Sequence, residues 1–205
     1  MKIAIQLFGH LRTFRETAEK FNQNVVEVNL RLGCEIDVFI HTWNELEARV
    51  STWHSDNQAL KGKRLSLLDV EALKSFYPNL KDVQVDDSID AHGSKISQKN
   101  VQRLRESYEE AHEIHYDWII ETRPDILFHN PLRIMDFIGT FKDEQLVANG
   151  ITVGNCILCG NSNFMRMNIA YPNYICEGDM IYFYKRGVEF EFATKVPINY
   201  LFPTD

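Results

Sequence analysis

Arg123 and Asp125, which flank Pro124, are the two residues best placed to do chemistry. They follow the apolar run 118–120, whose aromatic and β-branched residues favour a central strand. Pro124 has no N–H to continue a ladder, and it keeps the preceding residue extended. The cation and the carboxylate are therefore expected at the carboxyl end of a core strand, where open α/β sheets bind ligands. Together they could hold a diphosphate and its metal ion, although a lone Arg-Pro-Asp is more often a surface ion pair.

A second group of polar residues is expected at the carboxyl end of the first strand, residues 2–8. The loop 9–12 leads to Thr13-Phe14-Arg15-Glu16, which fits a capping box and predicts a helix to about Leu30. A strand, a glycine-containing loop and a helix N-terminus together form a natural anion site. The loop has neither the dinucleotide fingerprint nor a P-loop. Its candidate ligand-binding residues are Gly9, His10 and Arg12. Binding of a phosphate by Arg12 and capping of the loop by Arg12 are both left open.

Two further stretches should reach the same sheet edge. The second strand, 36–40, ends in His41-Thr42-Trp43, so His41 and Trp43 are candidates for nucleotide contact, with a core or rim position as the alternative for Trp43. The longest helix is expected to begin at Ser97 and to lead directly into the strand at 118–120. Its start therefore lies at the carboxyl edge, and this brings Gln98 and Asn100 toward the same crevice.

Residues 44–65 lack firm periodicity and are expected to form an insertion or a lid. This segment contains the basic cluster Lys61, Lys63 and Arg64, the one candidate for peripheral contact with a membrane surface. Ser66 and Asp69 resemble a second capping box, which predicts a helix to Phe76.

The carboxyl-terminal part of the chain is expected to contain further short strands and a helix. Strands are predicted at 145–148 and 155–158 with the loop 149–155 between them, and Glu177-Gly178-Asp179 precedes a predicted short helix at 180–184. Cys156 and Cys159 form a C-x-x-C, but no second ligand pair follows, and residues three apart on a strand face opposite ways. A zinc site is therefore not expected there.

Composition narrows the function classes. The chain has 205 residues, 44% of them hydrophobic and 25% charged, which fits a single globular domain spanning 1–205. The net charge of −7 argues against a general nucleic-acid binder. No apolar run approaches the roughly 20 residues that span a bilayer, and residues 1–7 do not resemble a signal peptide. Four cysteines without a secretory signal favour a cytoplasmic location.

The ordered set of motifs resembles a known group of enzymes. The stretches 9–14, 37–43 and 116–126, followed by the acidic element 177–179, resemble small bacterial sugar transferases of capsule and lipo-oligosaccharide synthesis. These enzymes look like GT-A type nucleotide-sugar glycosyltransferases, and the match runs from residue 2 to about 190. The resemblance implies a Rossmann-like three-layer α/β sandwich with a mixed, mostly parallel sheet. It places the nucleotide-sugar half in 1–128 and the acceptor half in 129–205.

The resemblance also implies roles for individual residues. In such enzymes an acidic Asp-x-Asp after a central strand holds Mg²⁺ or Mn²⁺ against the donor diphosphate; here Arg123 replaces the first carboxylate. Asp125 is therefore the metal candidate, while Arg123 could instead bind the diphosphate itself in fork geometry. Asp179 corresponds to the catalytic base of inverting enzymes, with Glu177 as the second candidate. An acidic helix N-terminus is the alternative interpretation of both residues.

The expected partners are a nucleotide-sugar donor and a glycan or lipid-linked glycan acceptor, at the inner face of the membrane for a lipid-linked one. Two other classes stay open. One is a different enzyme on a similar sheet, such as a phosphotransferase; a methyltransferase is disfavoured by the single glycine of the loop 9–12. The other is a non-catalytic nucleotide- or carbohydrate-binding protein, because fold alone does not decide function.

Overall fold

The structure is a computed structural model that describes residues 1–48, 59–89 and 93–135, together with the strand residues 146–147, 150–153, 156–159, 176–177 and 181–185. For these later strands the backbone alone is described. The predicted helix 180–184 falls on a strand. The predicted base Asp179 lies outside the described residues, as do residues 49–58 of the expected insertion 44–65.

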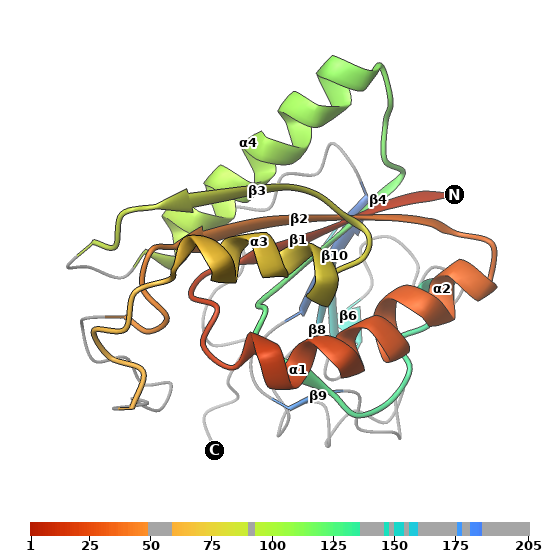
Figure 1. The fold of residues 1–205 in the computed structure, drawn as a ribbon. Coiled ribbons are helices and arrows are strands. Elements are labelled where there is room, and N and C mark those ends of the chain that lie inside the picture. Colours follow the sequence, from red (N-terminus) through yellow and green to blue (C-terminus); the bar gives the residue numbers. More distant parts are fainter. Residues whose placement is uncertain are drawn as a thin grey trace.

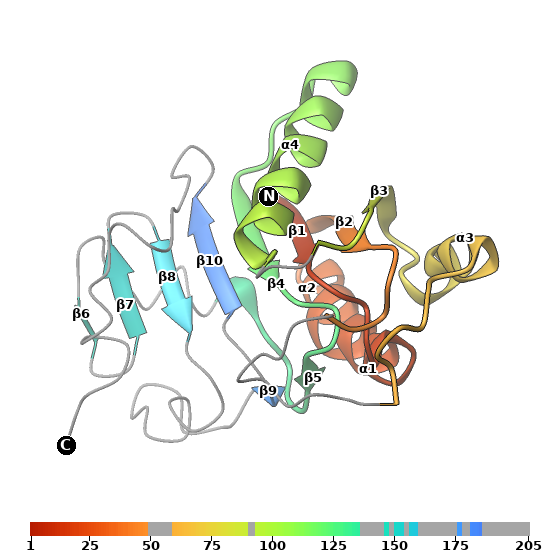
Figure 2. The same cartoon turned by 90° about the vertical axis from the view of Figure 1, so that its left-hand side faces the viewer.

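One mixed sheet organises the described part of the chain, with the strand order β3-β2-β1-β4-β10-β8-β7-β6 (Figures 1 and 2). Its first half is parallel and consists of β1 (Lys2–Phe8), β2 (Glu35–Trp43), β3 (Leu80–Asp86) and β4 (Trp118–Thr122). The chain builds outward from β1 to β2 and β3, then returns to place β4 on the other side of β1. This reversal makes the gap between β1 and β4 the topological switch point, where open α/β sheets bind ligands.

The second half of the sheet is antiparallel. It contains β6 (Leu146–Val147), β7 (Gly150–Val153), β8 (Cys156–Cys159) and β10 (Ile181–Lys185), and β10 joins it to β4. The expectation of a mostly parallel sheet therefore holds for the first half alone. The helix predicted at 180–184 is wrong, because Ile-Tyr-Phe-Tyr is a short β-favouring run whose length cannot support a buried helix. The loop expected at 149–155 contains β7.

Helices cover both faces of the parallel half, which gives the expected three-layer Rossmann-like arrangement there. α4 (Ser94–His112) lies on one face, and α1 (Phe14–Phe21), the π-helix η1 (Asn22–Glu27), α2 (Val28–Arg31) and α3 (Leu67–Phe76) lie on the other (Figures 1 and 2). Alternate strand residues build the main core on the α1 side. The members of this core from the strands are Ile3, Ile5, Leu7, Ile36, Val38, Ile40 and Ile120.

The two predicted capping boxes have opposite outcomes. Ser66 Oγ accepts a hydrogen bond from Asp69 N, and the Asp69 side chain accepts one from Ser66 N, so the capping box of α3 is confirmed. Thr13 makes no side-chain cap. Instead, its carbonyl accepts hydrogen bonds from Glu16 N and Thr17 N, and also one from Thr17 Oγ1 at 3.2 Å.

Asparagines fasten the π-helical stretch and the helix after it to neighbouring segments. Asn24 Nδ2 donates to Phe128 O at 2.8 Å, and Asn29 Nδ2 donates to Leu132 O at 2.7 Å. Asn29 is fully buried, and its Oδ1 accepts a hydrogen bond from Ile134 N. These amides satisfy backbone groups that would otherwise be buried without a partner. In the described part of the chain, no helix is long and apolar enough to cross a membrane.

Candidate functional site

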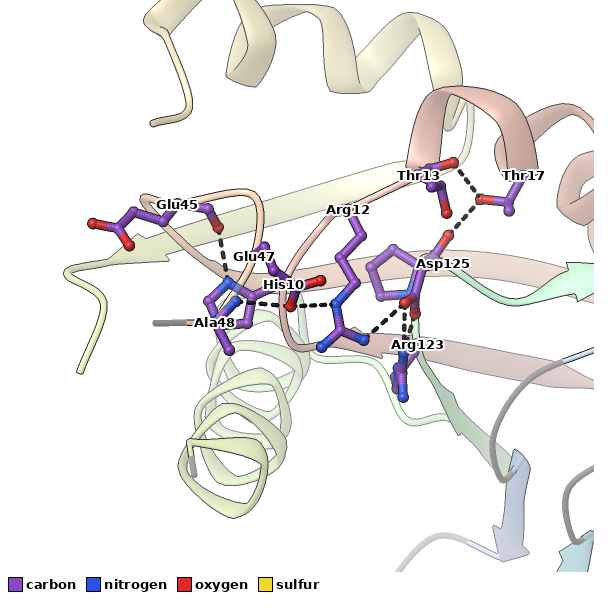
Figure 3. Close-up of polar contacts among 10 residues, drawn as sticks. His10, Arg12, Thr13, Thr17, Glu45, Glu47, Ala48, Arg123 and Asp125 are labelled. Carbon is purple, nitrogen blue, oxygen red and sulfur yellow. Dashed lines mark hydrogen bonds and ion pairs between the residues drawn. The ribbon is translucent and has the colours of Figure 1, made fainter. Parts of the chain in front are cut away.

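The loops after β1 and β4 meet at the switch point through one carboxylate and two guanidinium groups (Figure 3). Arg12 Nη1 donates to Asp125 Oδ2 at 3.0 Å, and Arg123 Nε donates to Asp125 Oδ1 at 2.8 Å. Arg123 Nη2 also donates to Asp125 Oδ2. The side chains of Arg12, Arg123 and Asp125 are 14%, 17% and 9% exposed. The loops 10–12 and 123–125, which the sequence predicts at one sheet edge, therefore meet through Arg12, Arg123 and Asp125.

Glu47 completes this group, which we call the Arg12–Asp125 cluster (Arg12, Glu47, Arg123 and Asp125). Arg12 Nε donates to Glu47 Oε1 at 2.8 Å, and the Glu47 side chain is 3% exposed. Arg12 N also donates to Leu46 O, which holds the 44–47 segment against the loop. Arg12 itself has a left-handed backbone, with φ of +43°. A non-glycine residue in that region is uncommon and is held there by its surroundings, a pattern that is frequent at ligand sites.

The charges of the cluster balance, and this fixes the ionisation of Asp125. Burial alone would raise the pKa of its carboxyl group, but the guanidinium groups of Arg123 and Arg12 outweigh burial and hold the pKa below its ordinary value. Asp125 is therefore an anion at neutral pH. Two cations and two carboxylates leave the cluster with no net charge.

This arrangement does not fit a metal ion on Asp125. Both oxygen atoms of Asp125 already accept hydrogen bonds from guanidinium groups, whose positive charge would repel a divalent ion. Within the described ranges there is no group of three His, Cys, Asp or Glu residues that could hold a metal. In the structure Asp125 is the counter-ion of two guanidinium groups, and its role as a Mg²⁺ or Mn²⁺ ligand stays a prediction that this pairing does not favour.

Several buried polar atoms near the cluster lack a hydrogen bond. Glu47 Oε2, Tyr77 Oη and Thr122 Oγ1 have no partner within the described residues. Burial raises the pKa of Tyr77, and the negative charge of Asp125 raises it further. Unsatisfied buried polar groups are rare in folded proteins and often mark a site for water or a ligand. Here three of them belong to residues in or beside the loops that carry the cluster.

His10 lies beside the cluster as a neutral imidazole. Burial lowers its pKa, and Arg12 lowers it further against the opposing effect of the Glu45 carbonyl. Its Nδ1 lies 2.8 Å from Glu45 O, which can only accept, so Nδ1 carries the proton and Nε2 has a lone pair. The ring tilts against Trp43 at a centroid distance of 6.3 Å. His10 is thus placed as a hydrogen-bond acceptor at the sheet edge.

The pKa of His10 predicts a loss of stability in acid. Because its folded pKa is lowered, the unfolded chain binds a proton first as the pH falls below about 6.5. The contribution to the free energy of unfolding is present above that pH and declines as the pH approaches the folded value. We expect His10→Gln to flatten the dependence of urea midpoints on pH between about 7 and 5. His115→Gln, at an exposed position, is the matched control, and an unchanged slope in His10→Gln would contradict the assignment.

His41 and Asn100 belong to one hydrogen-bonded network, in which His41 is buried and Asn100 is half-buried. Their contact with a nucleotide stays a prediction. His41 Nδ1 lies 2.7 Å from Ser97 Oγ, and His41 Nε2 lies 3.0 Å from Asp86 Oδ2. Asn100 Nδ2 donates to Asp86 Oδ2 at 2.9 Å, and Gly9 N donates to Ser97 Oγ at 2.7 Å. The network fastens the first turn of α4 to β2, to β3 and to the loop after β1.

The order Ser97, His41, Asp86 resembles a nucleophile–base–acid triad, but its burial argues for a structural role. Ser97 and His41 are both 0% exposed, so no substrate carbonyl can approach the hydroxyl. The Ser97 hydroxyl is also engaged by Gly9 N. The sequence placed these residues at the correct edge, and the structure shows that they satisfy one another.

Trp43 is likewise a packed residue. It is 3% exposed, its ring meets His41 edge-on at 5.2 Å, and it lies beneath Gly93. Stacking of Trp43 on a base would require that packing to open.

Gly93→Ala is expected to destabilise the protein by about 1–3 kcal/mol, because overpacking a filled site forces neighbours to move. A Cβ at Gly93 would lie 2.6 Å from Trp43 Cζ2, although the backbone φ of −85° suits alanine. Ser94→Ala, at the neighbouring exposed position, should change the free energy of unfolding by less than about 0.5 kcal/mol. Urea denaturation followed by circular dichroism measures the free energy of unfolding of both variants. Equal urea midpoints would show that an added Cβ at position 93 does not strain the contact with Trp43.

Gln98 and Glu177, two other residues predicted from the sequence, are not members of the Arg12–Asp125 cluster. Gln98 is half-buried on the second turn of α4, which begins at Ser94, three residues before the predicted start. Glu177 lies in β9 (Cys176–Glu177), which pairs with β5 (Leu127–Phe128) so that Glu177 is opposite Leu127. The backbone of Glu177 is therefore brought to the strand that begins two residues after Asp125.

Glu47 is the member of the Arg12–Asp125 cluster that sequence reasoning missed. It lies in the stretch interpreted as an insertion, and its position depends on tertiary pairing: Leu46 N donates to Lys63 O, and Leu65 N donates to Asn44 O. No local sequence motif predicts such a pairing between separate segments.

No family model matches this chain, and no curated protein matches it.

Proposed function

We propose that the protein is a nucleotide-sugar glycosyltransferase that transfers a sugar from a nucleoside-diphosphate donor to a glycan acceptor. The observation that supports it best is the pair of guanidinium groups, Arg12 and Arg123, joined through Asp125 at the switch point between β1 and β4. This is the place where an α/β sheet of this order receives a nucleotide. Paired guanidinium groups suit the bidentate recognition of phosphate oxygens.

In the proposed reaction, the Arg12–Asp125 cluster stabilises the leaving diphosphate. When the bond between the sugar and the diphosphate breaks, negative charge builds on the leaving oxygen, and preorganised positive groups lower the barrier. Arg12 Nη2 has no hydrogen-bond partner in the part of the chain that the structure describes, so it remains available for that oxygen. Asp125 and Glu47 hold both guanidinium groups rigid before the donor arrives.

Deprotonation of the acceptor is assigned to the acidic element at 177–179. Because β10 runs antiparallel to β4, its amino end lies beside the carboxyl end of β4, with Tyr182 opposite Glu121. The backbone of Ile181, the first residue of β10, therefore lies near the edge that carries the cluster. Within the proposal, Asp179 is the base of an inverting reaction and Glu177 its substitute.

Isothermal titration calorimetry with uridine, cytidine, guanosine and adenosine diphosphates, each with and without Mn²⁺, tests the proposal. We expect one of them to bind, and Arg123→Gln to weaken that binding by about 1.5–3 kcal/mol, the usual value of a hydrogen bond to a charged group. Arg103→Gln, at an exposed position on α4, is the charge-matched control. Failure of all four nucleotides to bind would remove the proposal. Enhancement by Mn²⁺ would restore a metal role for Asp125.

A non-catalytic nucleotide- or carbohydrate-binding protein is the second candidate. This candidate is favoured because guanidinium groups occupy both oxygens of Asp125. In the glycosyltransferases that the chain resembles, the corresponding carboxylate is expected to hold a metal ion. Incubation of the bound nucleotide-sugar with and without acceptor glycans separates the two candidates. Tight binding with neither hydrolysis nor transfer would favour the non-catalytic protein.

A further inference from the structure

The segment Lys61–Leu68, which we call the basic–leucine segment, differs from its surroundings in both charge and polarity. It carries Lys61, Lys63 and Arg64 and no acidic residue, in a chain whose net charge is −7. Leu67 and Leu68 follow directly and are 83% and 76% exposed, the two largest values among the exposed large hydrophobic residues described. Lys63 and Arg64 are also exposed. Cationic and apolar side chains are therefore presented together to solvent.

The backbone of this segment is held in place. Arg64 forms a β-bridge with Glu45, Leu46 N donates to Lys63 O, and the capping box of Ser66 and Asp69 starts α3 immediately afterwards. Leu65 packs against the core, so the segment is anchored between its exposed ends. The exposure of the two leucines is thus a feature of an ordered turn and helix start.

The placement of the leucines decides what kind of partner they suit. A helix that docks in a protein groove presents residues at i, i+3 and i+4 on one face. Leu67 and Leu68 are consecutive residues of the first turn of α3, so they diverge around the helix and form a convex tip. Figure 2 shows α3 at the periphery of the molecule, at the opposite end of the view from β6 and β7. The fluid apolar layer of a membrane can accommodate two leucines that point in different directions. A preformed protein groove accepts the residues of one helix face.

We propose that the basic–leucine segment binds an anionic membrane surface, with Leu67 and Leu68 entering the interface and Lys63 and Arg64 contacting lipid headgroups. Basic residues next to exposed apolar side chains are the usual composition of such peripheral contacts. Nearby acidic groups do not cancel the attraction: Asp69 is bound to Arg15 and to the cap, and Glu71 lies one turn further along α3. The inference does not depend on the proposed sugar transfer.

The contact would also place the candidate site near the membrane. The basic–leucine segment pairs with residues 44–46, and the same short stretch supplies Glu45 O to His10 and Leu46 O to Arg12 N. One connected loop system therefore links the proposed lipid contact to the Arg12–Asp125 cluster. A lipid-linked substrate held at the surface would need to travel little to reach it.

Vesicle flotation tests the proposal, with vesicles of phosphatidylcholine alone and of phosphatidylcholine with phosphatidylglycerol in equal parts. We expect the full chain to float with the anionic vesicles alone, and added salt to release it as the Debye length shrinks. Lys63→Ser/Arg64→Ser should weaken binding about five-fold or more for each charge removed. Leu67→Ser/Leu68→Ser should weaken it on the order of ten-fold. Circular dichroism confirms that each variant is folded.

Matched variants elsewhere on the surface serve as controls. Lys95→Ser/Lys99→Ser removes two exposed cations from α4, and Leu32→Ser removes an exposed leucine after α2; both should float like the parent. Absence of flotation, equal binding to neutral vesicles, or parent-like binding by both segment variants would overturn the proposal. So would a dimer in analytical ultracentrifugation that Leu67→Ser/Leu68→Ser dissociates, because that result would assign the segment to a second copy of the chain.

Discussion

Replacing Arg105 by methionine is expected to lower the free energy of unfolding by about 3–5 kcal/mol, because it breaks a buried ion pair and leaves one charge behind. Arg105 is a residue of α4 that is 1% exposed. Its Nε donates to Gln6 Oε1 at 2.7 Å, and its Nη1 donates to Glu109. Glu109 is 2% exposed and also accepts a hydrogen bond from Tyr116 N at 3.0 Å. Without the guanidinium, the Glu109 carboxylate would remain buried in the same apolar layer.

Urea denaturation of the parent, Arg105→Met, Glu109→Gln, the double variant and Arg103→Met tests this expectation. Arg103→Met, an exposed arginine on the same helix, should change stability by less than about 0.5 kcal/mol. Arg105→Met/Glu109→Gln should recover part of the loss, with a coupling energy of about 0.5–3 kcal/mol. If Arg105→Met and Arg103→Met unfolded at the same urea concentration, the buried pair would have no measurable role.

Asp125→Ala is expected to lower the free energy of unfolding by a similar amount, about 3–5 kcal/mol, because it leaves buried positive charges without their anion. It would leave Arg12 and Arg123 as two partly buried cations facing each other without their shared counter-ion. The pKa of Asp125 is lowered in the folded protein, so its contribution is present at neutral pH and is lost as the pH falls through that folded pKa. Glu71→Ala, an exposed carboxylate on α3, is the matched control.

The same variant separates a counter-ion from a metal ligand. If Asp125 neutralises the guanidinium groups, its loss creates an anion site, and added pyrophosphate should raise the melting temperature of Asp125→Ala more than that of the parent. If Asp125 is a metal ligand, Mn²⁺ should stabilise the parent, and Asp125→Ala should lose that effect. Stabilisation of neither protein by either addition would exclude both roles.

The parallel half of the sheet could be predicted because its signals are local. Alternation of apolar residues marks β1, and the proline after Arg123 marks the end of β4. Parallel strands bring their carboxyl ends to one edge, so the neighbourhood of Arg12, Arg123 and Asp125 followed from strand order alone.

The remainder depended on tertiary context. Glu47 reaches Arg12 through backbone pairing between 44–46 and 63–65, a contact that no periodicity encodes. The five residues of β10 are too few for periodicity to distinguish a strand from a helix. His41 and Asn100 are hydrogen-bonding residues at the expected edge, and their sequence positions cannot tell whether they bind a ligand or each other.

The π-helical stretch Asn22–Glu27 limits how the first half of the chain can change in length. An α-helix advances about 100° per residue, so removing one residue from this stretch would rotate everything after it by that angle unless the winding changed to compensate. Asn29 would then point away from Leu132 and Ile134, whose backbone groups it holds. The number of residues between Phe21 and Asn29 thus sets where the chain continues after β5, and insertions or deletions there should be tolerated far less than on the exposed turn at Gly62.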